Sequence, residues 1–325
     1  MFSDYDLYLP IIDRPCIRWP DGAPLALWIS PNVEHYEYLP PFNQASDPWP
    51  RTPHPDVMNY AYRDYGNRVG FWRMLEVLDH YRVQATVSLN VAVLDHFPAV
   101  RDAMLRRDWA FMAHGIYNTR HLYGATEEQE LALYRNCIET VKRYTGKQLK
   151  GMLSPAITNT AHTPELMARA GLIYTADWFW DDQPMPLRVK SGQLITVPYT
   201  VELNDSLMFQ HTYYRQGFEG EYFVQICKDQ FDVLYREGQR SGRVMCIALH
   251  PFLIGQPHRI QYLDEILSYV LSREGVWQTT ADEIAGYFYE NYYDQFLKHI
   301  ETLDRAGRLG RVFSGRDAVP RKVEA

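Results

Sequence analysis

The segment Ala110-Phe-Met-Ala-His114-Gly-Ile-Tyr-Asn118-Thr-Arg-His121 joins a short apolar run directly to a group of polar and ionisable residues. An uninterrupted apolar run is typical of a strand that is covered on both faces. The histidines and the asparagine that follow do not suit such a strand, so they mark the point where it ends. The segment therefore predicts a buried parallel strand whose carboxyl end carries polar groups suited to a site.

The same order, a β-rich run followed by a longer segment of helical periodicity, recurs along the chain and predicts an α/β fold. The eight predicted strands span Leu25–Ser30, Gln84–Asn90, Ala110–Ala113, Lys150–Leu153, Ile173–Ala176, Leu194–Pro198, Val244–Leu249 and Val276–Thr279. Apolar spacing and capping signals predict helices over Arg68–Tyr81, Glu127–Thr145 and Glu165–Ala170, and from Thr280 towards Leu303.

Eight strands with interleaved helices favour an α/β barrel or a close variant. A doubly wound open sheet is the alternative. It is disfavoured because the sequence contains neither of the glycine-rich phosphate-binding loops typical of that class, G-x-G-x-x-G or G-x-x-x-x-G-K-[ST].

We expect residues 1–304 to form a single domain with an N-terminal extension. Residues 39–55 contain six prolines and are expected to form a lid or rim over a site. Residues 305–325, rich in glycine and charge, are expected to form a surface tail or an arm that contacts a neighbouring subunit.

The composition excludes several classes of function. A net charge of -7 argues against nucleic acid or an anionic membrane as a partner, because both favour a basic surface. No apolar run approaches the length of about 20 residues that spans a bilayer. The first ten residues lack the pattern of a signal peptide, and the four cysteines are scattered without a Cys-x-x-Cys pair. We therefore expect a cytoplasmic protein with reduced thiols.

Polar residues follow four of the predicted strands, and in a parallel barrel these positions share one rim. A single histidine after a strand is more often structural, but four such groups at the same end indicate a site. They are Asn32, Glu34 and His35; His114, Asn118 and His121; Asp177, Asp181 and Asp182; and His250.

The ordered set of motifs resembles the polysaccharide deacetylase (NodB-homology) superfamily over most of the chain. His114 stands in the first position of that family's His-x-x-x-His metal motif. The other matching segments are Ser30-Pro-Asn-Val-Glu-His35, Gly151-Met-Leu-Ser-Pro155, Ala176-Asp-Trp-Phe-Trp-Asp-Asp182 and Ala248-Leu-His-Pro251. The resemblance implies a distorted (β/α) barrel of seven to eight strands.

Within the superfamily, the chain resembles the branch that contains the cofactor-independent allantoinase and the cyclic imide hydrolases. The segments that carry this resemblance are 177–184, 249–259 and 276–284. It implies hydrolysis of a non-peptide C–N amide bond in a small molecule such as a ureide or imide, by a homo-oligomer (a dimer or tetramer).

The chain departs from the family's metal motif, because Asn118 occupies the second histidine position and Leu153 replaces an arginine. A neutral amide is a poor zinc ligand. Two interpretations remain. In one, Glu34, His114 and His121 hold one divalent metal, zinc or manganese. In the other, no metal is used and these groups act directly on water and substrate.

The resemblance also implies roles for the site residues. Glu34 is expected to act as the base and His250 as the general acid, with Asp177 orienting His250 or pairing with the base. The expected substrate-binding residues are Asn32, Asn118, Pro155, Trp178 and Asp181. Two other functions stay open: de-N-acetylation of amino sugars or peptidoglycan fragments, and a binding protein with a decayed catalytic site.

Overall fold

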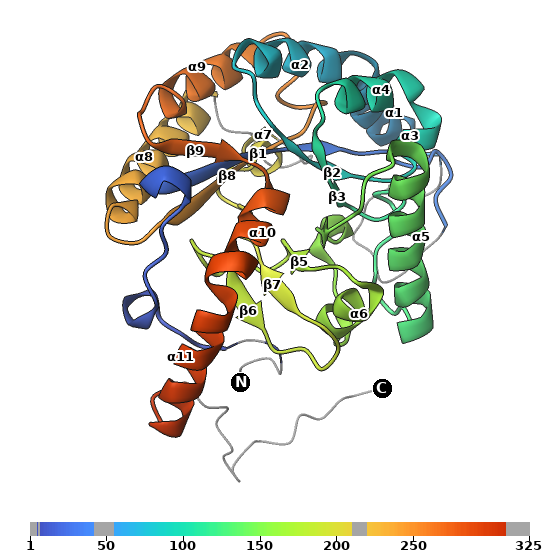
Figure 1. The fold of residues 1–325 in the computed structure, drawn as a ribbon. Helices are drawn as coiled ribbons and strands as arrows, with labels where there is room; N and C mark the ends of the chain where they lie inside the picture. Colours follow the sequence, from blue (N-terminus) through green and yellow to red (C-terminus); the bar gives the residue numbers. More distant parts are fainter. Residues whose placement is uncertain (1–4, 6, 42–54, 210–219, 310–325) are drawn as a thin grey trace, which may run out of the picture.

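The computed structural model describes residue 5 and residues 7–41, 55–209 and 220–309, which form a sheet wrapped by helices (Figure 1). The predicted proline-rich loop 39–55 and the tail 305–325 lie largely outside these residues. Among the helices that are described, none is long and apolar enough to cross a membrane.

The sheet is the curled part of a barrel. Its strands follow the order β6-β7-β5-β4-β3-β2-β1-β8, with β9 paired to β1, and all neighbours are parallel except β6 and β7. The strands are β1 (Leu25–Val33), β2 (Thr86–Leu89), β3 (Ala110–Ala113), β4 (Gly151–Met152), β5 (Tyr174–Thr175), β6 (Met185–Leu187), β7 (Leu194–Thr196), β8 (Arg243–Leu249) and β9 (Val276–Thr279). The predicted distorted barrel is confirmed.

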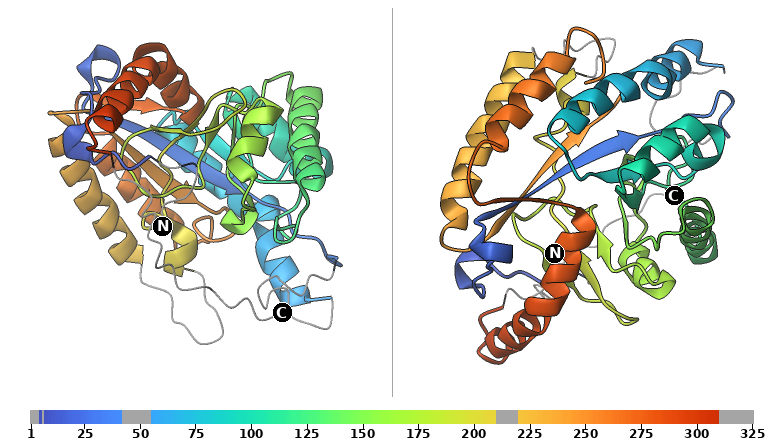
Figure 2. Two further views of the ribbon diagram at one scale, coloured as in Figure 1. Left: turned by 90° about the horizontal axis from the view of Figure 1, so that it is seen from below. Right: turned by 45° about the horizontal axis from the view of Figure 1, so that its top comes forward.

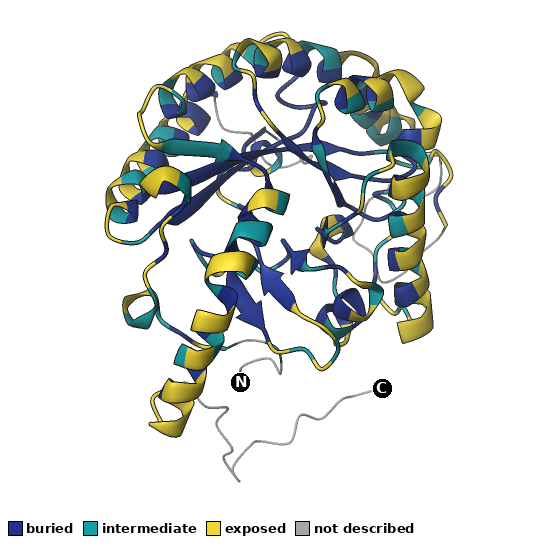
Figure 3. Cartoon of the chain, in the orientation of Figure 1, coloured by how far each residue is buried: buried dark blue, intermediate teal, exposed yellow. Residues whose placement is uncertain are grey.

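Amphipathic helices cover the outer face of this sheet and leave their polar sides in solvent (Figures 2 and 3). The α-helices of the described residues are α1 (Val57–Tyr65), α2 (Phe71–His80), α3 (Val93–His96), α4 (Pro98–Arg106), α5 (Glu127–Thr145), α6 (Thr163–Ala170), α7 (Asp205–Phe209), α8 (Gly220–Gly238), α9 (Ile260–Val270), α10 (Ala281–Asn291) and α11 (Tyr293–Arg305). Of these, α10 lies across the amino ends of the strands, since Ala281 N–H donates to Thr86 at the start of β2 (2.8 Å). The carboxyl ends are thus left for a site.

Strand β1 organises the sheet, because all nine of its residues are buried and it pairs with three other strands. It runs beside β8 from Leu25 to Pro31. On its other edge the first half pairs with β9 and the last two residues pair with β2. One edge of β1 therefore serves two neighbours in succession, β9 along its amino half and β2 at its carboxyl end.

The eight predicted strands are all present, and one strand was missed. Strand β6 has only three residues and a central proline, Pro186, so it gives no alternating signal and suits an edge. The predicted C-terminal helix is divided at Tyr292 into α10 and α11, after the capping box of Thr280 and Glu283 that the sequence indicates.

Candidate active site

Three ionisable side chains enter the barrel because of the two-residue repeat of its strands. In β1, Leu27 and Ile29 pack against the helices, whereas Ala26 and Trp28 face the opposite core. Continuing this alternation beyond the strand places Glu34 on the same side as Trp28. His114 lies two residues beyond the inward-facing Met112 of β3, and His250 lies two residues beyond the inward-facing Ala248 of β8. All three therefore project inward at the carboxyl ends.

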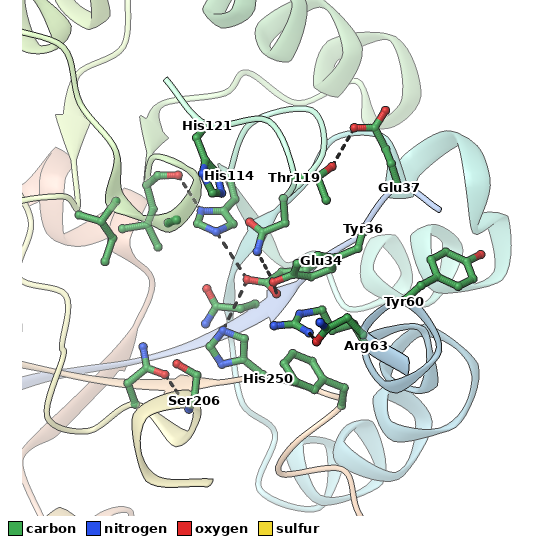
Figure 4. Close-up of a pocket in the computed structure, with 18 of the residues that line it drawn as sticks. Glu34, Tyr36, Glu37, Tyr60, Arg63, His114, Thr119, His121, Ser206 and His250 are labelled. Atoms are coloured by element: carbon green, nitrogen blue, oxygen red, sulfur yellow. Dashed lines mark hydrogen bonds and ion pairs between the residues drawn. The ribbon is translucent and has the colours of Figure 1, made fainter. Parts of the chain in front are cut away.

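The carboxylate of Glu34 lies between two imidazole rings (Figure 4). Its Oε1 is 3.5 Å from Nε2 of His114 and 3.5 Å from Nε2 of His250. Its Oε2 accepts a hydrogen bond of 3.0 Å from the hydroxyl of Tyr36. Glu34 is only 8% exposed, so these contacts replace most of its water.

His250 is held from behind by Asp205, a residue that the sequence analysis did not select. Nδ1 of His250 lies 2.7 Å from Oδ1 of Asp205, and the backbone N–H groups of His250 and Ile254 donate to the same carboxylate. Since both ring nitrogens of His250 face carboxylates, each is placed to donate a proton. Asp205, not Asp177, therefore orients this imidazole.

His114 is oriented by a backbone carbonyl. Its Nδ1 lies 2.8 Å from the carbonyl oxygen of Leu153, which can only accept, so Nδ1 carries a proton and Nε2 faces Glu34. Asp177 contacts Ser154, the residue after Leu153. Its carboxylate accepts hydrogen bonds from the backbone N–H and the hydroxyl of Ser154 (2.7 Å each) and from the side chain of Asn159 (2.9 Å). Asp177 therefore braces the loop that orients His114 and lies outside the cavity lining.

Asn118 extends the network through Tyr36. The Tyr36 hydroxyl uses its single proton in the hydrogen bond to Glu34, so its oxygen can only accept a hydrogen bond from Asn118. The structure agrees, since Nδ2 of Asn118 donates to this oxygen. This orientation leaves Oδ1 of Asn118 buried, without a hydrogen-bond partner among the described residues. An unpartnered buried acceptor costs about 1–3 kcal/mol, so a ligand that donates a proton there would be favoured.

These groups line a cavity of about 350 Å3. Tyr38, Tyr60, Arg63 and Phe252 contribute to its wall, and the size suits a small molecule. Its lining also includes Ala156 and Ile157, which follow the Leu153 loop. Ala156 and Ile157 both adopt left-handed backbone conformations (φ 49° and 56°), which is a strained geometry for these residue types.

The electrostatics of the site favour an ion pair. Burial raises the pKa of Glu34, but the charge of His250 and hydrogen bonds from both histidines outweigh it and lower that pKa far below its usual value. Burial lowers the pKa of His250, but the charges of Asp205 and Glu34 outweigh it and raise the pKa to about 10. At neutral pH the pair is therefore carboxylate and imidazolium.

The three expected metal ligands, Glu34, His114 and His121, do not form one cluster in the described residues. Among the residues that the structure describes, no three His, Cys, Asp or Glu side chains are arranged to hold an ion. Glu34 pairs with His114 and His250, so His121 does not complete its cluster as expected, although it lines the cavity.

The expected substrate-binding residues divide into two groups. Asn32 and Asn118 line the cavity, whereas Pro155, Trp178 and Asp181 are not part of its lining. Asp181 instead forms a two-bond ion pair with Arg14 (2.6 Å each) and lines a second cavity of about 890 Å3 beside the N-terminal segment. Asp181 is displaced because it lies four residues beyond Asp177, in the turn that leads to β6 rather than at a strand end.

Two residues of the site were missed, for different reasons. Asp205 lies at the start of the short helix α7, after an irregular stretch, and it reaches His250 only because Asn204 bridges to Ala248 of β8. Tyr36 follows Glu34 by two residues, so the alternation of β1 carried a signal for it. No comparable signal marked Asp205.

Known proteins resemble this chain in sequence and in fold. Residues 54–175 match the family model described as polysaccharide deacetylase. A Schizosaccharomyces pombe protein named provisionally as a polysaccharide deacetylase is 27% identical over 255 residues, covering 73% of this chain and 78% of that protein. The chain is therefore similar in sequence to proteins named polysaccharide deacetylase.

Solved structures of this deacetylase type extend the match. A Mycobacterium smegmatis structure, assigned provisionally as a polysaccharide deacetylase, has a TM-score of 0.73 at 22% identity and covers 97% of this chain and 100% of its own. The structure of PuuE allantoinase has a TM-score of 0.74 at 26% identity, over 86% of this chain and 94% of that one. The deacetylase-type barrel therefore extends well beyond the segment that the family model matches.

Replacing Asp205 by Asn tests the ion pair. A histidine whose pKa is raised from 6.5 to about 10 on folding stabilises the protein fully below pH 6.5, and this contribution is lost as the pH rises towards 10. We expect Asp205→Asn to lower the free energy of unfolding by about 3 kcal/mol at pH 6. The gap in unfolding free energy between the variant and the unmodified protein should narrow towards pH 10.

Urea unfolding from pH 6 to 10 measures this gap. The matched control is Asp108→Asn, at a side chain that is 88% exposed and should change stability by less than about 0.5 kcal/mol. A gap that stays constant with pH would show that Asp205 acts only through packing.

Proposed function

We propose that this deacetylase relative hydrolyses a non-peptide C–N amide bond in a small molecule such as a ureide or cyclic imide. The observation that carries the proposal is the carboxylate of Glu34 held between the Nε2 atoms of His114 and His250 inside a cavity of about 350 Å3. A base, a proton donor and room for a reactant are the parts that amide hydrolysis needs. The similarity to PuuE allantoinase supports the choice of a small amide.

The proposed reaction begins with a water at Glu34. The carboxylate of Glu34 takes a proton from the water while the oxygen of the water attacks the carbonyl carbon of the substrate. Nε2 of His114 faces the same carboxylate oxygen and helps to orient the water. His250 then donates its Nε2 proton to the leaving nitrogen. The C–N bond breaks and leaves a carboxylic acid and a protonated nitrogen group, and both stay in one molecule when the substrate is cyclic.

Charge coupling makes a strongly acidic Glu34 useful as a base. Its pKa is low because it faces the charge of His250. When His250 gives its proton to the leaving nitrogen, that positive charge disappears and the affinity of Glu34 for a proton rises. The two proton transfers therefore assist each other.

Loss of His250 tests the assignment of the acid. We expect His250→Ala to lower kcat by about 10²-fold or more, the usual scale for a general acid. His162→Ala is the matched control, because that histidine is 56% exposed and its side chain pairs with the surface residue Glu127. Steady-state kinetics that leave kcat of His250→Ala within about threefold of the unmodified protein would remove it from the mechanism.

A substrate panel with and without metal tests the reaction class and the cofactor together. We expect turnover of at least one compound among allantoin, hydantoins and cyclic imides. We further expect less than about a twofold change in kcat after dialysis against a chelator, because no three His, Cys, Asp or Glu side chains among the described residues are arranged to hold an ion. Activity lost on chelation and restored by zinc or manganese would reject the metal-free mechanism.

The panel also includes N-acetylated sugars, because relatives bear the name of polysaccharide deacetylase. Turnover of these sugars alone would make de-N-acetylation the function. A decayed, non-catalytic site is disfavoured by the intact Glu34–His250–Asp205 pairing, and it would predict no turnover of any compound.

Asn118 supports a substrate that carries an N–H group. Its unpartnered Oδ1 requires a donor, and an amide nitrogen supplies one whereas the oxygen of an ester does not. We expect Asn118→Leu to lower kcat/KM for an amide about tenfold more than for the matching ester. Equal losses on both substrates would mean that Asn118 only shapes the cavity.

A further inference from the structure

A single π-helical turn interrupts the helix that passes over the candidate active site. It spans Gly66–Gly70, between α1 and α2, and is closed by a bond from the N–H of Phe71 to the carbonyl of Gly66. Such turns insert one extra residue and widen the helix, and they occur frequently at functional sites. In this chain the turn contacts the segments that carry both Glu34 and His250.

The first contact is to Glu34. Nδ2 of Asn67 donates a hydrogen bond of 2.8 Å to the backbone carbonyl of Glu34. Asn67 is only 5% exposed, and Glu34 lies just beyond the end of β1, where strand pairing no longer fixes the backbone. The side chain of Asn67 thus holds the carbonyl of Glu34, while Asn90 accepts from the N–H of the next residue, His35.

The second contact is to the loop that follows His250. A Cβ atom on Gly70 would lie 2.0 Å from the carbonyl oxygen of Pro251, and one on Gly66 would lie 2.9 Å from the backbone nitrogen of Phe252. Both distances are shorter than van der Waals contact, so only glycine allows this approach. Arg73, one turn further on, donates to the carbonyl of Gly255 in the same loop.

We infer that the π turn Gly66–Gly70 is a positioning element that fixes the separation of Glu34 and His250. Asn67 holds the backbone of Glu34, and Gly66 and Gly70 hold the loop of His250 against the same helix. Both contacts are made by the same turn. If the end of β1 moves relative to the end of β8, the turn is therefore strained. The catalytic consequence rests on the proposed function, whereas the geometric statement does not.

The substitution Gly70→Ala tests this inference, because the added Cβ must push the Pro251 loop away from the turn. We expect kcat to fall about tenfold to 10²-fold with a small change in KM, since misplacement of reacting groups by about 1 Å has effects of that size. The matched control is Gly286→Ala in α10, where an added Cβ meets no atom within 4 Å. Gly286→Ala should keep kcat.

A second measurement does not depend on activity. The low-field imidazole N–H resonances of 15N-labelled His250 report its contacts with Glu34 and Asp205. We expect them to shift in Gly70→Ala and in Asn67→Ala and to stay unchanged in Gly286→Ala. Asn67→Ala leaves the glycine contacts intact, so it decides the question if Gly70→Ala fails to fold.

The outcomes separate the two claims. Unchanged His250 resonances in folded Asn67→Ala or Gly70→Ala overturn the positioning role, whatever the activity. Shifted resonances in a protein that turns over none of the assayed amides would support the positioning role and reject the proposed function. Shifted resonances with kcat equal to that of Gly286→Ala would overturn the catalytic consequence.

Discussion

The carboxylate of Glu34, shared by the imidazole groups of His114 and His250, is the interaction to which the surrounding structure is fitted. A buried carboxylate is costly unless its charge is compensated and its lone pairs are filled. Here one oxygen faces two ring nitrogens and the other accepts from Tyr36. Removing any of these partners would leave charge or polar atoms in a space closed to most water.

The groups that compensate the charge of Glu34 are themselves held by further hydrogen bonds. His250 requires Asp205, His114 requires the carbonyl of Leu153, and the loop of Leu153 requires Asp177. Each link is a short hydrogen bond between buried groups, which is strong because little water competes with it. Asp177 therefore matters to the site although it does not reach the cavity, since its bonds to Ser154 determine where the Leu153 carbonyl points.

The barrel is open where this network lies. The strands that carry Glu34, His114 and His250 end at the same level, and α10 covers the opposite ends. Substitutions relative to the metal-dependent pattern fit the same arrangement. Asn118 is a poor replacement for a histidine ligand, but its amide donates to Tyr36.

The sequence by itself determined the fold class and three members of the site. Apolar runs identified eight strands, and Glu34, His114 and His250 were selected because they follow three of these strands, whose carboxyl ends share one rim of a parallel barrel. Local capping residues also fixed where α5 and α10 begin.

Only the tertiary structure decided the partners. Asp205 is far from His250 in sequence and lies beside it through one β-bridge, and Asp177 and Asp181 point to different surroundings although they share one motif. Such choices depend on how separate strand ends and loops pack in space. That packing is a property of the whole barrel, and no periodicity within a single segment encodes it.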